Sequence, residues 1–387
     1  MNLSESLAAL RDSIALFEES QNVVKEDKGH LDHPEDLVFL GGSQGASRAI
    51  QSSIDTVKNP NKVTIKWDGY PALIFGRDSR GQFSIMDKHM FNKKDGSGRQ
   101  VYSPEQFVKY DTDRGVDRSG LHQLITNIWS GLEKADNSKG YYWGDLLFSA
   151  PLQDQNGLYK FKANPNGIAY TVETNSDVGK FLTGKTAGIV VHQFIDANAP
   201  STDSAVPLDG TIGKLKNNSD VAIVPAKMPI TPKLKLDNAA VKNASSAVQK
   251  YGAALDQLMD TAPQARNTFN QLFTTYINKR IVAGDLSNLL QGFMDYVQSR
   301  PMTDSMRSKI MLHLENNMEG LKGAFEIWVS IYKLKMSIVE QLNKAAESSP
   351  VKGYLQDGTQ TQEGFVSHGL KFVDRMGFSR QNLAGRA

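Results

Sequence analysis

The sequence contains no cysteine among its 387 residues. Disulfides, thiolate metal sites and cysteine nucleophiles are therefore excluded, and this composition fits a cytoplasmic protein. The chain also lacks an excess of charge of either sign, because 44 basic residues against 42 acidic ones give a net charge of +2. A nearly neutral chain can still carry a local basic groove, so composition argues neither for nor against a nucleic-acid partner.

Long apolar runs are absent as well. No stretch is long enough to span a bilayer, so we expect no membrane partner. The first 20 residues lack the basic segment and apolar core of a signal peptide. Their leucine, isoleucine and phenylalanine residues recur at helical spacing, which predicts an amphipathic helix.

The spacing of apolar residues divides the chain into four parts. Residues 1–62 are mainly helical, and we expect this segment to pack on the core. From 63 to 235, short strand-like runs alternate with turn signals. Residues 236–349 return to helical spacing, and the apolar stripe of their last helix is interpreted as core packing. Residues 350–387 are strand-like again. The pattern predicts an α+β protein with an all-helical insertion between two parts of one β-rich unit.

The segment Val63–Gly69, VTIKWDG, carries the main chemical signal. Lys66 ends a β-branched run, and Asp68 and Gly69 follow it. A lysine that attacks a nucleoside triphosphate must be neutral, and at its ordinary pKa only about one in a thousand is neutral near pH 7.5. A rigid, partly desolvated strand end beside a metal ion lowers that pKa. The same residues can also form an ordinary exposed turn between two strands.

Further motifs follow Lys66 in a fixed order. They are Tyr142-Trp-Gly-Asp-Leu146, the apolar strand Gly188–His192, Glu363-Gly-Phe-Val366 and finally Lys371. Together these motifs resemble those of the covalent nucleotidyltransferases, which are ATP-dependent DNA ligases, RNA ligases and mRNA capping enzymes. The chain is most similar to the divergent ligase-like proteins of large tailed phages.

This resemblance implies a nucleotidyltransferase (adenylation-domain) core of antiparallel sheets flanked by helices. It implies that Lys66, with Asp68 in its motif, attacks the α-phosphate of ATP in the presence of Mg²⁺ and forms a lysyl-AMP. Lys371 would neutralise that phosphate. Asp145, which replaces the family's glutamate, would contact the sugar or the metal, and Glu363 would hold the Mg²⁺ ion.

Other residues are expected to bind the nucleotide. His192 and Phe194 would stack on adenine, although residues in an apolar strand are more often core. Lys88 begins a basic run that would contact the triphosphate or a nucleic-acid backbone, unless it is a solvated loop. The expected nucleotide-binding set is Thr64, Ile65, Gly69, Arg77, Lys88, Asp145, His192, Phe194 and Arg375.

Two positions depart from the family pattern. Pro71 stands where ligases often have an arginine, and Arg77 is the candidate substitute. Val373 stands where the family has the second lysine of K-x-K, and Arg375 is the candidate substitute. The chain ends at Ala387, soon after the last motif, so we expect no C-terminal OB domain. That expectation disfavours a capping enzyme.

Two rival motifs are present. Gly179–Thr186 has the literal spacing of a P-loop, but the residues after it are strand-like where a P-loop has a helix, so we expect none. Asp209–Lys216 imitates the last two ligase motifs with both lysines, but its surroundings are loop-like, and we favour the pair that contains Glu363 and Lys371.

Three functions stay open. The favoured function is an ATP-dependent polynucleotide ligase or adenylyltransferase acting on RNA or DNA ends, in the cytoplasm of an infected bacterial host if the chain is phage-encoded. The second is a catalytically silent phage protein that binds nucleic acid or an assembly partner on the same fold. The third is a GTP-dependent capping-type guanylyltransferase.

Overall fold

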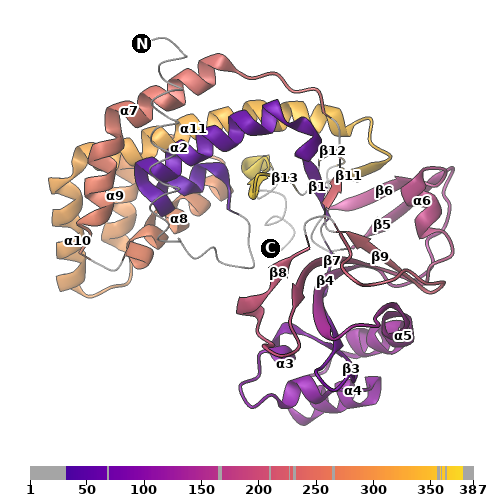
Figure 1. The fold of residues 1–387 in the computed structure, drawn as a ribbon. Helices are drawn as coiled ribbons and strands as arrows, with labels where there is room; N and C mark the ends of the chain where they lie inside the picture. Colours follow the sequence, from indigo (N-terminus) through magenta and orange to yellow (C-terminus); the bar gives the residue numbers. More distant parts are fainter. Residues whose placement is uncertain are drawn as a thin grey trace.

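The computed structural model describes most of the chain beyond residue 31. The described residues are 32–67, 69–163, 168–208, 211–225, 227–229, 232–263, 266–354, 358, 360–361 and 364–377. The expected N-terminal amphipathic helix, Asp68, Glu363 and the side chain of Lys66 lie outside them. The fold is α+β, with a helical unit and a β unit that occupy separate regions of the molecule (Figure 1).

The described strands form three sheets. Their bounds are β1 Thr64–Lys66, β2 Ala72–Arg77, β3 Phe83–Met86, β4 Gly140–Phe148, β5 Leu158–Lys162, β6 Ala169–Glu173, β7 Ala187–Ile195, β8 Val206–Pro207, β9 Val221–Pro225, β10 Lys227–Pro229, β11 Val351–Tyr354, β12 Gln360–Thr361, β13 Phe365–Ser367 and β14 Leu370–Phe372. Sheet A has the order β10-β1-β13-β14, and sheet C the order β12-β11-β6-β5. Sheet B has the order β3-β2-β4-β7-β8, with β9 parallel to β7 while its other pairs are antiparallel.

The helical unit combines one early helix with those that follow β10. Its helices are α2 Leu37–Lys58, α7 Asn238–Asp260, α8 Arg266–Ala283, α9 Leu289–Ser299, α10 Asp304–Asn316 and α11 Met318–Ala346, with the 3-10 turns η1 Pro34–Asp36 and η2 Pro60–Lys62. Asp237 and Thr303 cap α7 and α10, each accepting a hydrogen bond from the backbone N–H three residues later. Along α11, Leu321, Phe325 and Trp328 are buried, which confirms that the apolar stripe packs in a core.

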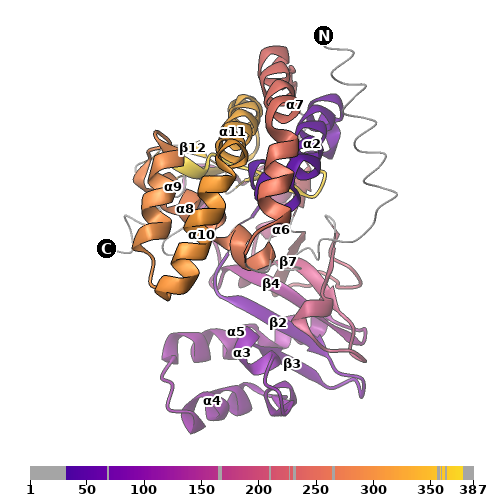
Figure 2. The same ribbon diagram turned by 90° about the vertical axis from the view of Figure 1, so that its left-hand side faces the viewer.

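The early helix α2 belongs to the helical unit. It packs against α7 and α11 (Figure 2), and its buried residues share one apolar core with them. Phe39 of α2 stacks on Phe273 of α8 with ring centroids 5.1 Å apart. The described part of residues 1–62 thus belongs to the helical bundle, and it also contacts sheet A, where Thr56 Oγ1 donates to Ser367 Oγ of β13 at 2.9 Å.

Sheet A joins the two units because its strands come from both ends of the described chain. β1 pairs with β13 in the register Thr64↔Val366 and Ile65↔Phe365. Ile65 and Phe365 belong to the helical core, whereas Trp67, just after β1, packs in the core between sheets B and C. One short strand is thus anchored in both units.

The segment that runs from α3 to α5 packs against sheet B (Figure 1). It contains α3 Lys88–Phe91, η3 Ser97–Gln100, α4 Pro104–Asp113 and α5 Ser119–Ala135; the remaining short helices are α6 Asp177–Leu182 and η4 Thr202–Ser204. The expectation of only short strands over 63–235 overlooked α4 and α5. Ile125, Ile128 and Leu132 of α5 are buried at helical spacing, and this periodicity was the available signal.

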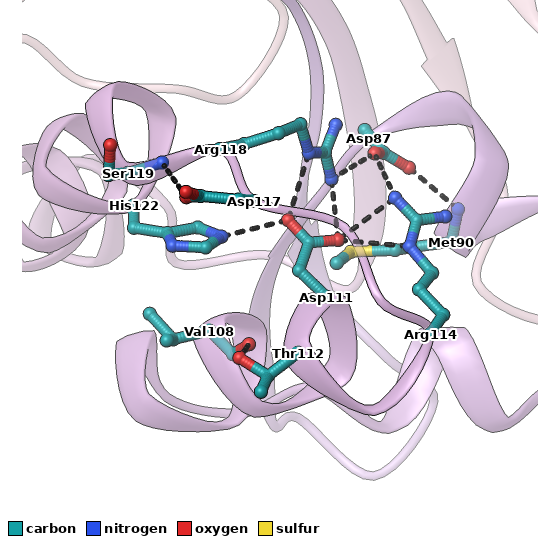
Figure 3. Close-up of polar contacts among 10 residues, drawn as sticks. All are labelled: Asp87, Met90, Val108, Asp111, Thr112, Arg114, Asp117, Arg118, Ser119 and His122. Atoms are coloured by element: carbon teal, nitrogen blue, oxygen red, sulfur yellow. Dashed lines mark hydrogen bonds and ion pairs between the residues drawn. The ribbon is translucent and has the colours of Figure 1, made fainter.

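A polar cluster fixes this segment internally (Figure 3). Buried Asp111 forms hydrogen bonds with Arg118, at 2.7 and 2.9 Å, and with His122, at 2.9 Å. Burial opposes ionisation of Asp111, but these hydrogen bonds outweigh it, and the pKa of Asp111 lies below its ordinary value. Arg114 and Arg118 also pair with Asp87, just before α3, at 3.7 and 2.8 Å. Arg114 and Arg118 therefore link α3, α4 and α5 through ion pairs with Asp87 and Asp111.

A buried ionic network fixes η1 and the last described residues to α11. Lys335 Nζ donates to Glu35 Oε1 at 2.6 Å, and both side chains are fully buried. Arg375 donates to Glu35 Oε1 at 3.1 Å and to Asp36 Oδ1 at 2.8 Å, and Asn278 accepts from it at 2.6 Å. Burial opposes ionisation of Glu35, but Lys335 and Arg375 outweigh it, and the pKa of Glu35 lies below its ordinary value. Two carboxylates thus face two cations.

No described helix is both long enough and apolar enough to cross a membrane. The longest of them, α11, carries the buried Lys335 among its apolar residues.

Replacing Lys335 with Met is expected to lower the free energy of unfolding by about 3 kcal/mol, because it removes one of two cations that compensate buried Glu35. Urea denaturation followed by tryptophan fluorescence measures this change. The matched control is Lys333→Met, on the exposed side of the same helix, which should stay within about 0.5 kcal/mol of wild type. Equal losses in the two variants would contradict a stabilising role for the network.

Candidate functional site

The turn that follows Lys66 is packed tightly against β4. A Cβ placed on Gly69 would lie 2.7 Å from Asp145 Cβ and 2.7 Å from the Leu146 carbonyl oxygen, so no larger residue fits there without a shift. The Tyr70 N–H donates to that same carbonyl at 2.9 Å. The absence of a side chain at Gly69 therefore allows the backbone after β1 to lie directly against Asp145 of β4.

Sheet A brings the segment of the last motifs to the same place. In adjacent strands Thr64 pairs with Val366 and Val366 pairs with Lys371, so these positions share one face. Extending the β1–β13 register by one residue sets Gly364 opposite Lys66. A Cβ on Gly364 would lie 2.8 Å from Lys371 Cε, which shows that the Lys371 stem crosses Gly364. The positions of Lys66 and Lys371 therefore lie on one face of sheet A.

Two further candidate residues meet on sheet B. Asp145 Oδ2 and His192 Nε2 lie 2.8 Å apart, and their side chains are 20% and 19% exposed. β4 and β7 pair Trp143 with Gln193 but Gly144 with Val191, so His192 is the extra residue of a β-bulge. A bulge changes the direction in which a side chain leaves the strand. Here the imidazole of His192 is hydrogen-bonded to the carboxylate of Asp145.

Lys88 reaches the same strand from α3. Its Nζ lies 5.1 Å from the centroid of the Trp143 ring, within the range of a cation–π contact. Trp143 is half-buried two residues before Asp145, and no local sequence pattern indicates its contact with Lys88. Phe194 instead packs edge-on against Tyr142, with centroids 5.3 Å apart, and its ring lies against Gly140. This contact makes Phe194 part of the sheet B core.

The structure does not bring three other expected residues to this place. Ile65 is buried in the helical core. Arg77 lies at the far end of β2, where its guanidinium donates to the carbonyls of Asp136 and Glu133 at 3.1 and 3.2 Å. Arg375 is held in the buried ionic network. None of them is therefore arranged to contact a nucleotide beside Lys66.

The rival motifs have other structures. The P-loop string begins inside α6 and ends before β7, which is the opposite order to a P-loop, so the expectation of none is confirmed. Lys185 donates to the carbonyl of Asn218. In the second rival segment, Asp209 and Gly210 lie outside the described residues, and the backbone N–H groups of Lys214 and Lys216 bond to Tyr142 Oη and the Ala135 carbonyl at 3.1 and 2.9 Å.

Asp145 is the expected metal ligand that the structure describes. Within the part of the chain that the structure describes, no three His, Asp or Glu side chains form a metal-binding group. Asp145 has one oxygen engaged with His192, and Glu363 is outside the described residues. Magnesium bound to proteins commonly takes one or two carboxylates together with substrate phosphates and water. The described donor set fits such an ion in the presence of a nucleotide.

The fold defines an α+β protein in which a helical bundle and a β unit share one small sheet. Residues 28–386 match the profile of DUF6267, a family of unknown function, so the chain belongs to that family. No curated protein and no solved structure matches the chain.

Replacing Gly69 with Ala is expected to cost about 1–3 kcal/mol of unfolding free energy, because the added methyl group collides with the backbone of β4. Gly120→Ala is the control, since a Cβ on this α5 residue meets no atom within 4 Å. Thermal unfolding of both variants measures the difference. A Gly69→Ala variant as stable as the Gly120→Ala variant would contradict the close approach.

Asp136, beside Arg77, provides a pH test. Burial raises the pKa of this carboxyl to about 6, although Arg77 Nε lies 3.8 Å away. The folded state therefore binds the proton more tightly than the unfolded state, and stability from this group is lost as pH rises from about 4 to about 6. Asp136→Asn is expected to gain stability relative to wild type across that interval, by at most about 3 kcal/mol. Urea titrations at several pH values measure it, and a constant difference would contradict the raised pKa.

Proposed function

We propose that the chain is an ATP-dependent polynucleotide ligase or adenylyltransferase that forms a lysyl-AMP on Lys66, on a nucleotidyltransferase core. Its acceptors are RNA or DNA ends, and its location is the cytoplasm. The observation that carries the proposal is that motifs far apart in the sequence converge at the end of β1. Gly69 touches Asp145, and Gly364, beside Lys371, is next in register to Lys66.

Two glycines of the expected motifs, Gly69 and Gly364, each lie against a residue of another motif. Gly69 is required by its close approach to Asp145 Cβ and the Leu146 carbonyl oxygen, whereas Gly364 lies against the flexible side chain of Lys371. Gly69 and Asp145 lie about 75 positions apart in the sequence, and the β1–β13 pairing joins residues about 300 positions apart. The contacts therefore support the ordered motifs as parts of one site.

The first transfer uses the neutral amine of Lys66. The amine forms a bond to the α-phosphorus of ATP, the bond from that phosphorus to the bridging oxygen breaks, pyrophosphate leaves, and the amine loses its proton to solvent. Lys371 would neutralise the charge that develops on the α-phosphate. Asp145, oriented by His192, would accept a hydrogen bond from the ribose. Mg²⁺ held by Asp145 and Glu363 would neutralise the triphosphate.

The second transfer delivers AMP to a nucleic acid. An oxygen of a 5′-phosphate end forms a bond to the phosphorus as the bond to Lys66 breaks, and the lysine regains a proton. The oxygen of a neighbouring 3′-hydroxyl then forms a bond to the phosphorus of the 5′-phosphate and loses its proton to solvent, while the anhydride bond to AMP breaks, so AMP leaves and the strand is joined. The charge of Lys88 above Trp143 would assist in holding the phosphate groups.

A second candidate is a catalytically silent module that binds nucleic acid or an assembly partner. The observation in its favour is that Arg77 and Arg375, the expected replacements for two family cations, are both engaged in structural contacts. A capping-type guanylyltransferase that uses GTP is the third candidate. The nucleotide that becomes attached to the protein distinguishes all three.

Incubating the full chain with Mg²⁺ and α-labelled ATP is expected to give a labelled band on a denaturing gel. Lys66→Ala should abolish the label, because no other group would form the covalent bond. Lys62→Ala, at an exposed position four residues earlier, should label like wild type.

Label from GTP alone would replace the proposal with the capping-type activity. Folded protein that is free of bound AMP and takes no label from either nucleotide would sink the proposal and favour the binding module. Label that persists in Lys66→Ala would show that the nucleophile is misassigned.

A further inference from the structure

The outward face of sheet C carries three lysines and one tyrosine. Lys160 and Lys162 on β5 are exposed, and Lys352 and Tyr354 on β11 are half-buried. Alternate residues of a strand share a face, and the opposite face of these strands is buried in the core between sheets B and C. The four residues therefore form a single surface, here called the lysine face.

The strand register fixes the arrangement of this face. Lys160, Thr171 and Lys352 form one cross-strand row. Lys162, Ala169 and Tyr354 form the next row on the same face. With strands about 4.8 Å apart, Lys160 and Lys352 lie about 10 Å apart at their backbones, and Lys160 and Lys162 lie about 7 Å apart. The three positive charges thus lie on β5 and β11, on either side of the uncharged β6 positions Ala169 and Thr171.

Little opposes these charges within the described part of the chain. No ion pair is formed there by Lys160, Lys162 or Lys352. Glu173 is the acidic residue at one end of the face, next to the row of Lys160. The face keeps an excess of positive charge and includes the ring of Tyr354.

The lysine face is rigidly connected to the end of β1. On the inward side of sheet C, Tyr170 and Phe161 pack on Trp67 with ring centroids 4.9 and 6.4 Å away. Trp67 directly follows Lys66. Figure 1 shows β5 and β6 on the side of the β unit away from α8–α10. The lysine face is therefore connected through the core to the residue beside the proposed nucleophile, and Lys160 and Lys162 on it are exposed.

We propose that the lysine face binds the phosphodiester backbone of single-stranded nucleic acid, with Tyr354 stacking on a base. This inference rests on the proposed function, because it assigns the surface that holds the strand whose end is joined. Spread lysines bordering an aromatic ring are the combination by which proteins follow a single strand, whereas binding to an anionic membrane would gain from apolar side chains that insert.

The test uses fluorescence anisotropy with labelled single strands of about 16 nucleotides, one RNA and one DNA of the same sequence, both 5′-phosphorylated. The variant carries Lys160→Gln, Lys162→Gln and Lys352→Gln. Its matched control carries Lys242→Gln, Lys309→Gln and Lys333→Gln, at exposed positions of the helical unit, and has the same net charge.

The lysine-face variant is expected to raise Kd for the strand at least tenfold and to reduce the slope of log Kd against log salt by about 2, because three phosphate contacts are lost. Comparing RNA with DNA identifies which backbone is preferred. The control should keep the wild-type Kd, and equal losses in both variants would overturn the proposal.

Self-labelling with ATP needs no nucleic acid and keeps the two proposals separate. Normal labelling of the lysine-face variant together with weak strand binding supports the face and shows that the variant is folded. Wild-type protein that labels but binds neither strand overturns the face and leaves Lys66 chemistry standing. Wild-type protein that does not label but binds a strand through the lysine face overturns only the Lys66 chemistry. Binding by the face to phosphatidylserine vesicles but not to either strand would also overturn it.

Discussion

The buried pairing of Glu35 and Asp36 with Lys335 and Arg375 is the constraint on which the architecture depends. It joins three segments of the chain, and Glu35 and Lys335 within it are fully buried from water. Removing one member of the network lowers the free energy of unfolding strongly, because the opposite charge is left buried without compensation. The network therefore favours the observed relative position of η1, α11 and the residues after β14.

That position determines where Lys371 stands. Arg375 follows β14 by three residues, and the Asp32 carbonyl, just before η1, accepts from the Lys371 N–H at 2.9 Å. Phe372 packs in the helical core from the same strand. The helical bundle thus acts on the β unit through sheet A, by holding β13 and β14 against β1. Helices that look like an insertion in the sequence serve as the support of the site.

The sequence predicted local features well and distant pairings poorly. The β-branched run before Lys66 indicated a strand, and β1 ends at that lysine. The apolar stripe of α11 was equally readable, because burial on one helical face leaves a regular period. Arg77 and Arg375 were expected to bind the nucleotide, but they pair with Asp136 and Asp36 instead. These partners are distant in sequence, and no local pattern predicts such pairs. The bulge at His192 depends on a register between two strands, which composition alone does not encode.

The pairing of β1 with β13 has a consequence for how the protein is made. Lys66 leaves the ribosome roughly 300 residues before Lys371, an interval of about 15–60 seconds at ordinary rates of synthesis. During that time β1 has no β13 beside it, and Arg375 has not yet met Glu35. Long-range pairings of this kind also close slowly, because the intervening chain must be ordered first. A nascent chain or a chain truncated before β13 therefore lacks a finished sheet A, and β1 gains its partner strand only after residues 365–372 have been synthesised.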